Sequence, residues 1–251
     1  MLKANVLFSR LSIMAFMVGC LLASLSFSAC RKLKTPEAVA ERENWYESFN
    51  DSVSYYENRS SEIDGELQNL NEKVTHLLQN FEKVKKPREV SGYYILKGWG
   101  DKLPMKSTGI YARINENESL ELIATLSGST FNRIEIVGLS SDMVKHDQAL
   151  NYRHDSFNTV FFSGEKANAI AEYISQHSGS PLNLIFMEGG TKKSSFAIPA
   201  SEKQMISQTW VLFSTQQEIR SLQKQLAICA RKIDTFRRLK DDRHTPSPPS
   251  P

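Results

Sequence analysis

Residues 36–86 have the sequence PEAVAERENWYESFNDSVSYYENRSSEIDGELQNLNEKVTHLLQNFEKVKK, in which apolar or aromatic residues recur at alternating spacings of three and four. This stripe runs from Val39 to Val84 and is interrupted only at Arg42 and Ser60. Such a repeat predicts one long helix with a narrow apolar face, the pattern that favours left-handed coiled-coil pairing.

The ends of this first helix are also marked in the sequence. Thr35 can cap a helix whose first residue is Pro36, where a missing N–H does no harm. Pro87 cannot continue a helix, so the helix is predicted to end at Lys86.

A second helix is predicted over residues 201–243, because apolar residues recur there every seven positions. Ser201 and Gln204 form a capping box at its start. The repeating residues are Met205, Leu212, Ile219, Leu226 and Ile233.

Between the two helices, residues 91–199 change to the two-residue period of β-strands. Asn115-Glu116-Asn117 and Gly189-Gly190 predict hairpin turns, and residues 165–176 predict one short helix. The predicted strands are residues 92–97, 109–114, 119–126, 133–137, 158–163, 182–187 and 195–198.

Together these patterns predict an α+β fold: a long antiparallel two-helix coiled coil that carries an inserted small β-rich domain with one short helix. Antiparallel pairing is expected because both helices adjoin the same compact domain. A parallel dimer of the same helices is the alternative. The Pro-rich residues 245–251 cannot form helix or a central strand and are predicted to be disordered.

The first thirty residues predict export. Lys3 and Arg10 precede the uncharged residues 11–29, and a cysteine follows at position 30. Phe27-Ser28-Ala29-Cys30 resembles the lipobox of bacterial lipoproteins. That resemblance implies cleavage after residue 29, lipid on Cys30, residues 30–35 as a linker, and a membrane-anchored chain in the cell envelope that faces the periplasm or the cell exterior.

Two alternatives to this processing remain open. Met17-Val18-Gly19-Cys20 is also lipobox-like, although cleavage there leaves the apolar residues 21–29 on the mature chain. An uncleaved anchor is the other, because nineteen helical residues rise about 28 Å and could just span a bilayer core.

Charge and cysteine content limit the function classes. Removing residues 1–29 removes Lys3 and Arg10, which lowers the formal net charge from +3 to +1. A nearly neutral chain lacks the positive field that nucleic-acid binding requires. If Cys30 is lipidated and Cys20 is removed, Cys229 is the one cysteine left, and no intramolecular disulfide can form.

Residues 145–155, KHDQALNYRHD, contain two His-Asp pairs, at His146 and His154, in a predicted loop. Histidine and carboxylate side chains can ligate zinc or transfer protons. The sequence lacks H-x-x-x-H and C-x-x-C spacing, so a solvated polar loop is the favoured interpretation. No catalytic residue, metal ligand or cofactor is therefore assigned.

The function expected from these features is non-enzymatic. The chain is similar to uncharacterised coiled-coil cell-envelope lipoproteins, which implies a structural or adaptor protein that presents its domain to an envelope protein or glycan. A ligand-binding or hydrolytic module with a site near His146 and His154 is the alternative. The sequence leaves the oligomeric state open.

Overall fold

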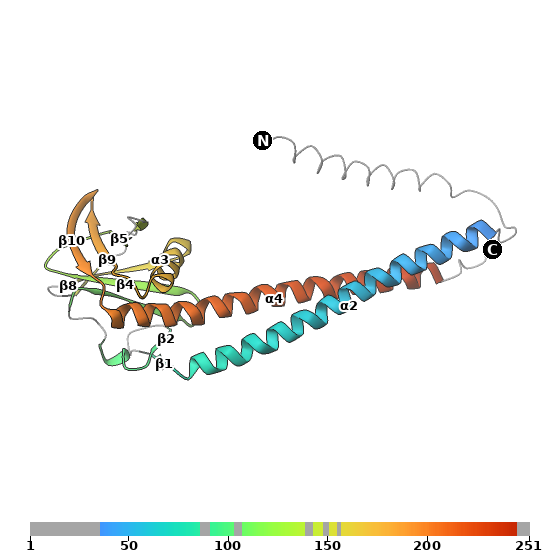
Figure 1. Cartoon of the computed structure of the whole chain (residues 1–251), viewed down its shortest axis with the longest axis horizontal. Coiled ribbons are helices and arrows are strands. Elements are labelled where there is room, and N and C mark those ends of the chain that lie inside the picture. The colour runs from blue at the N-terminus through green and yellow to red at the C-terminus, as the bar shows by residue number, and fades with distance from the viewer. Residues whose placement is uncertain are drawn as a thin grey trace. The chain divides into compact units, whose positions relative to one another are not determined.

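A computed structural model describes residues 36–85, 91–102, 107–138, 143–147, 151–154 and 157–244 (Figure 1). The described elements are α2 (Pro36–Leu78), β1 (Phe81–Val84), β2 (Tyr93–Leu96), the 3-10 turn η1 (Gly100–Lys102), β3 (Gly109–Asn115), β4 (Leu120–Ser127), β5 (Arg133–Val137), β6 (Met143–Asp147), β7 (Asn151–His154), β8 (Phe157–Ser163), α3 (Glu165–Gln176), β9 (Asn183–Glu188), β10 (Thr191–Ala197) and α4 (Ala200–His244).

The chain divides into two units between Ser52 and Val53, so α2 crosses the boundary. In the first unit, the ring of Trp45 contacts the rings of Tyr46 and Phe49, each with centroids 5.1 Å apart. The second unit holds every strand, α3, α4 and the rest of α2.

The strands form two antiparallel sheets. The six-stranded sheet has the order β1-β2-β3-β4-β8-β7, and the four-stranded sheet has the order β10-β9-β5-β6. Gly189 and Gly190 both have positive φ, 55° and 82°, which the tight β9–β10 hairpin turn requires. The predicted turn at this position is confirmed.

The first half of α4 is built into the core of this unit. Met205, Ile206 and Leu212 are fully buried in the same apolar cluster as Ile110 and Ala112 of β3. Burying side chains of this size contributes about 1.5–3 kcal/mol each relative to leaving them exposed. The residues of this helix half therefore fold with the six-stranded sheet.

Backbone hydrogen bonding explains why α4 lies against β3. Strand β2 pairs with β3 only at Asn115 and Ile114. Among the described residues, no other strand pairs with β3 on that side. The Ile110 N–H donates instead to the Glu202 carboxylate at 3.0 Å, and the Ala112 N–H to the Met205 sulfur at 3.3 Å. Side chains from the start of α4 thus satisfy amides that would otherwise be buried without partners.

The predicted coiled-coil fold is wrong. The structure has three described α-helices and two antiparallel sheets, and it shows no long two-helix coiled coil. Helix α2 ends at Leu78 instead of Lys86, and residues 81–84 form an edge strand of the six-stranded sheet. Strand β1 and the first half of α4 accordingly pack with the sheets.

The reason is that a heptad stripe specifies one apolar face and not what covers it. Val74, Leu77 and Leu78 at the end of α2 pack on the core of the sheets, as do Met205 and Leu212 of α4. Residues that fit a helix–helix seam in sequence therefore bury themselves against the domain.

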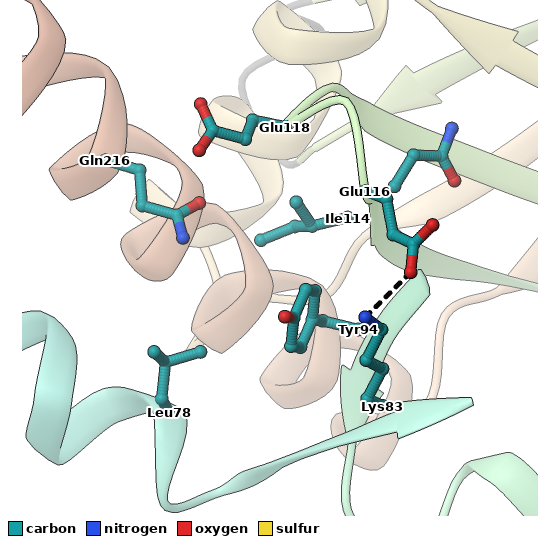
Figure 2. A pocket seen from close by; sticks show the side chains of 8 residues that line it. Leu78, Lys83, Tyr94, Ile114, Glu116, Glu118 and Gln216 are labelled. Carbon is teal, nitrogen blue, oxygen red and sulfur yellow. Dashed lines mark ion pairs between the residues drawn. The ribbon is translucent and has the colours of Figure 1, made fainter. Parts of the chain in front are cut away.

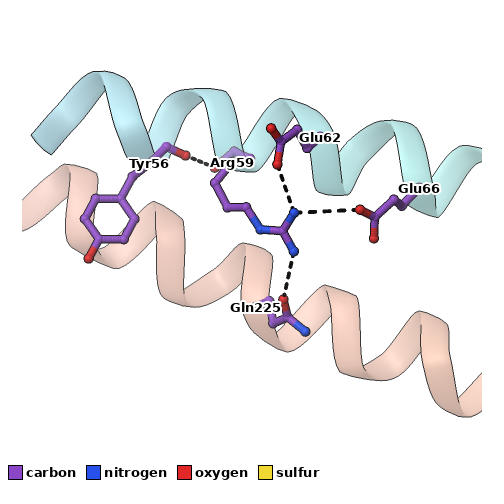
Figure 3. Close-up of polar contacts among 6 residues, drawn as sticks. Tyr56, Arg59, Glu62, Glu66 and Gln225 are labelled. Atoms are coloured by element: carbon purple, nitrogen blue, oxygen red, sulfur yellow. Dashed lines mark hydrogen bonds and ion pairs between the residues drawn. The ribbon is translucent and has the colours of Figure 1, made fainter. Parts of the chain in front are cut away.

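Within the second unit, α2 and α4 are in contact. Ile63, Leu222 and Cys229 form a small buried cluster, and the rings of Tyr56 and Phe236 stack with centroids 6.0 Å apart. Figure 3 shows the Arg59 guanidinium of α2 paired with the carboxylates of Glu62 and Glu66 of its own helix. The same guanidinium donates a hydrogen bond of 3.5 Å to Gln225 Oε1 of α4. The Cys229 thiol is free and buried.

The buried Glu202 makes stability depend on pH. Burial raises the pKa of its carboxyl group from 4.5 to about 7, although the Ile110 N–H opposes the rise. The folded state therefore holds the proton more tightly than the unfolded state.

We predict that the contribution of Glu202 to the free energy of unfolding is fully present below pH 4.5. This contribution is lost as the pH rises through about 7. Glu202→Gln keeps an acceptor for Ile110 and removes the titration. In urea unfolding at about pH 8 the variant should exceed the wild type by about 2–3 kcal/mol, and at about pH 4 the two should agree. Equal stability at both pH values would contradict this assignment.

Candidate functional site

A pocket of about 310 Å³ lies where α4, the end of α2, β1, β2 and the β3–β4 hairpin meet. Figure 2 shows Leu78, Tyr94, Ile114, Gln216 and Glu118 arranged around this space. The remaining lining residues are Lys83, Asn115 and Glu116.

The β3–β4 hairpin carries three of the polar residues, and its turn is strained. The Glu118 N–H donates to the Asn115 carbonyl at 2.8 Å, and the Asn115 N–H to the Ser119 carbonyl at 2.9 Å. Glu118 has φ 59°, a left-handed conformation usual for glycine in such a turn. The Glu118 carboxylate therefore lies at the pocket, although the backbone conformation of Glu118 is unfavourable for any residue other than glycine.

Ion pairs hold the hairpin on both sides of the pocket. The Lys83 ammonium of β1 lies 2.7 Å from the Glu116 carboxylate, and this contact lowers the pKa of Glu116 and raises that of Lys83. The Arg220 guanidinium of α4 pairs with the Glu118 carboxylate and donates to the Glu118 carbonyl at 3.4 Å. Each of these two carboxylates therefore has a cationic partner from another element.

Gln216 contributes the one buried side-chain atom of the described lining residues that has no hydrogen-bond partner. Its Oε1 is buried and has no hydrogen-bond partner among the described residues. Leaving such an acceptor unsatisfied costs about 1–3 kcal/mol. Gln216 lines the pocket, but its Oε1 is itself buried, so a donor from a bound group reaches this oxygen only if the side chain moves.

The sequence-based candidates do not lie at this pocket. His146 is on β6, an edge of the four-stranded sheet, paired with Ile134, whereas His154 is on β7, an edge of the six-stranded sheet, paired with Phe157. The predicted loop is therefore wrong at these residues, which are in strands, and their backbones belong to different sheets. Asp155 lies outside the described residues.

Two further findings concern metals and membranes. Within the described ranges, no three His, Cys, Asp or Glu residues gather closely enough to hold a metal ion. None of the described helices is both long and apolar enough to cross a bilayer. Cys30, Cys20 and the predicted signal peptide lie outside the described residues.

Comparisons with known proteins found no matching family model, no similar curated protein and no similar solved structure.

The sequence predicts the β3–β4 hairpin beside the pocket, but it does not predict the pocket. The Asn115-Glu116-Asn117 turn was predicted and is confirmed. A non-glycine residue at its left-handed position was a usable signal, because glycine or asparagine is usual there. Gln216 gave none, since its only sequence-level feature is a polar position in an amphipathic helix.

We predict that Glu118 is not the most stable residue at its position. Glu118→Gly and Glu118→Ala both remove the ion pair with Arg220, but only glycine removes the left-handed strain. The glycine variant should exceed the alanine variant by about 1 kcal/mol in urea unfolding. It should also match or exceed the wild type, because a partly exposed ion pair contributes only about 0–1 kcal/mol.

An alanine variant as stable as the glycine variant would show that the turn is unstrained. A glycine variant far below the wild type would show that the carboxylate is needed for folding.

Proposed function

We propose that the protein is a membrane-anchored cell-envelope lipoprotein that acts as an adaptor, and that it binds its envelope partner at the pocket beside the β3–β4 hairpin. The anchoring part rests on Phe27-Ser28-Ala29-Cys30 and on the basic residues that follow it, which suit a position next to lipid headgroups.

The observation that carries the binding part is the buried Gln216 Oε1 without a partner. A well-packed protein rarely leaves a buried acceptor unsatisfied. Here the acceptor belongs to a residue that lines a pocket, and the pocket is bordered by a strained turn and two ion pairs. Strain of this kind concentrates at functional sites. The arrangement fits a site whose last hydrogen bond is made by a bound group.

The chemistry of the pocket favours binding over turnover. The Glu118 carboxylate pairs with Arg220, and the Glu116 carboxylate pairs with Lys83. The pairing with Lys83 lowers the pKa of Glu116, so Glu116 is poorly suited to donate a proton at neutral pH. Serine, cysteine and histidine are not among its eight lining residues. A group held here would be recognised by shape and hydrogen bonds.

Site-specific photocross-linking in intact cells tests the proposal. Gln79 is exposed and follows the pocket residue Leu78, whereas the exposed Lys192 lies on β10 of the other sheet. A photoreactive residue at position 79 should capture one reproducible envelope partner, and the same residue at position 192 should not.

Two variants separate the parts of this proposal. Gln216→Leu should abolish the adduct while the exposed neighbour variant Gln217→Leu leaves it intact. Cys30→Ala should move the protein out of the membrane fraction and lose the adduct, and the wild-type mature protein should begin with lipid-bearing Cys30 by mass spectrometry. If the cross-linked adduct still forms in the Gln216→Leu variant, the pocket is not the partner site. If the mature protein still begins with Met1, it is not anchored by lipid.

A further inference from the structure

The second half of α4 has an exposed face that is turned away from α2. Leu222, Cys229 and Phe236 contact α2, and Figure 3 shows Gln225 at the edge of that contact, bonded to Arg59. Successive helical residues are about 100° apart, so seven side chains on the other side fall within about 60° of one line along α4. This outer face consists of Lys224, Ile228, Arg231, Lys232, Thr235, Arg238 and Leu239, all of which are exposed.

Two large aliphatic side chains lie on the outer face. Ile228 is 53% exposed and Leu239 is 49% exposed, and Tyr55 is the one other exposed large hydrophobic residue in the described part of the chain. Ile228 and Leu239 are eleven residues apart, which is about three helical turns, so they share one side of α4 about 16 Å apart along its axis. The two residues therefore form an apolar row and are not scattered over the surface.

The outer face is also strongly basic. Residues 224–239 contain five basic residues and one acidic residue, Asp234. Asp234 lies 3.8 Å from Arg238 with both side chains mostly exposed, and such an open pair contributes little. Arg237, on the α2 side, pairs with Glu57. The outer face itself thus combines four cations with two aliphatic side chains and carries no carboxylate among its described residues.

This combination fits an anionic bilayer surface better than a protein. Lysine and arginine side chains can extend to headgroup phosphates while neighbouring aliphatic side chains enter the boundary of the acyl region. The outer face is the convex side of a single helix, so it gives a protein partner no groove to fill, whereas a fluid bilayer adapts to a convex surface. A second copy would bring the same cations and repel them.

We propose that the outer face of α4 binds the surface of an anionic phospholipid bilayer. Ile228 and Leu239 enter the acyl boundary, and the four cations of the face lie beside headgroup phosphates. The proposal rests on the proposed function for the presence of the chain at a membrane, and it adds a second contact that selects anionic lipid. Because the face is about 22 Å long, α4 lies along the bilayer over this stretch.

Quenching by brominated lipids tests the contact in the full chain reconstituted into vesicles. A polarity-sensitive fluorescent amino acid replaces Thr235 on the outer face or, as the control, the exposed Ala230, which lies about 140° around the helix. In equimolar phosphatidylcholine and phosphatidylglycerol, position 235 should be quenched severalfold more than position 230. In phosphatidylcholine alone both positions should stay unquenched, and added salt should reduce the quenching at position 235.

Charge variants test the role of the cations. Arg231→Gln with Lys232→Gln should lower the ratio of bilayer-bound to free outer faces about tenfold or more. Lys166→Gln with Lys192→Gln removes the same charge from exposed positions on α3 and β10 and should leave the quenching unchanged.

A variant without the apolar row tests the aliphatic side chains. Ile228→Ser with Leu239→Ser should also reduce the quenching at position 235. The urea midpoint should stay unchanged, because both side chains are exposed.

Several outcomes would overturn the proposal. These are equal quenching at positions 230 and 235, equal quenching in neutral vesicles, and full quenching in the Arg231→Gln, Lys232→Gln variant. Protection of position 235 before vesicles are added would identify a second copy as the occupant. A photoreactive residue at position 235 that captures a protein and no lipid in cells would identify a protein partner.

The same experiment separates this proposal from the lipid anchor. A chain that neutral vesicles do not retain, but that binds anionic vesicles with position 235 quenched, would refute the anchor and keep the outer face as a lipid-binding surface. A chain firmly held in both kinds of vesicle with position 235 unquenched would refute the outer face and keep the anchor.

Discussion

The structure depends on the contact between the first half of α4 and strand β3. Strand β2 leaves β3 after two residue pairs, so the Ile110 and Ala112 amides need acceptors from elsewhere. Glu202 and Met205 supply them, and the apolar residues Ile206 and Leu212 bury the face of the sheet around those bonds. This arrangement fixes both the position and the rotation of α4 on the sheet.

The pocket follows from that placement. Once α4 is set on β3, Gln216 and Arg220 lie one to two turns farther along, beside the β3–β4 hairpin. Arg220 binds the carboxylate and the carbonyl of Glu118, and Lys83 binds Glu116 on the other side. A turn with an unfavourable backbone angle is thus held in place by rigid elements, which is how a precise binding geometry is maintained.

Sequence patterns predicted the local elements well where a single period was unambiguous. The strands at residues 133–137 and the helix at residues 165–176 have the predicted bounds. Residues 145–155 are predicted as a loop because this stretch is polar, yet residues 143–147 and 151–154 form the strands β6 and β7. Edge strands tolerate such sequences, since one side of each needs no partner strand.

The larger error came from the heptad stripe. A stripe of this kind shows that one face of the helix is apolar. A helix that packs on a sheet needs the same apolar face as a helix in a coiled coil, so the stripe does not distinguish the two. Phe81 illustrates this, because it continues the helical spacing yet is buried as an edge-strand residue paired with Leu96. The pocket could not be predicted from the sequence, because only tertiary packing brings residues 78, 94, 114 and 216 together.

Native-state hydrogen exchange tests most directly whether α4 belongs to the core of the sheets. Amides of residues 205–213 should share the highest opening free energy with β3, including Ile110 and Ala112, while residues 56–70 of α2 and 226–237 of α4 should open at lower free energy. If residues 205–213 instead exchanged together with residues 56–70, before β3, the two helices would form their own cooperative unit. That result would contradict the account.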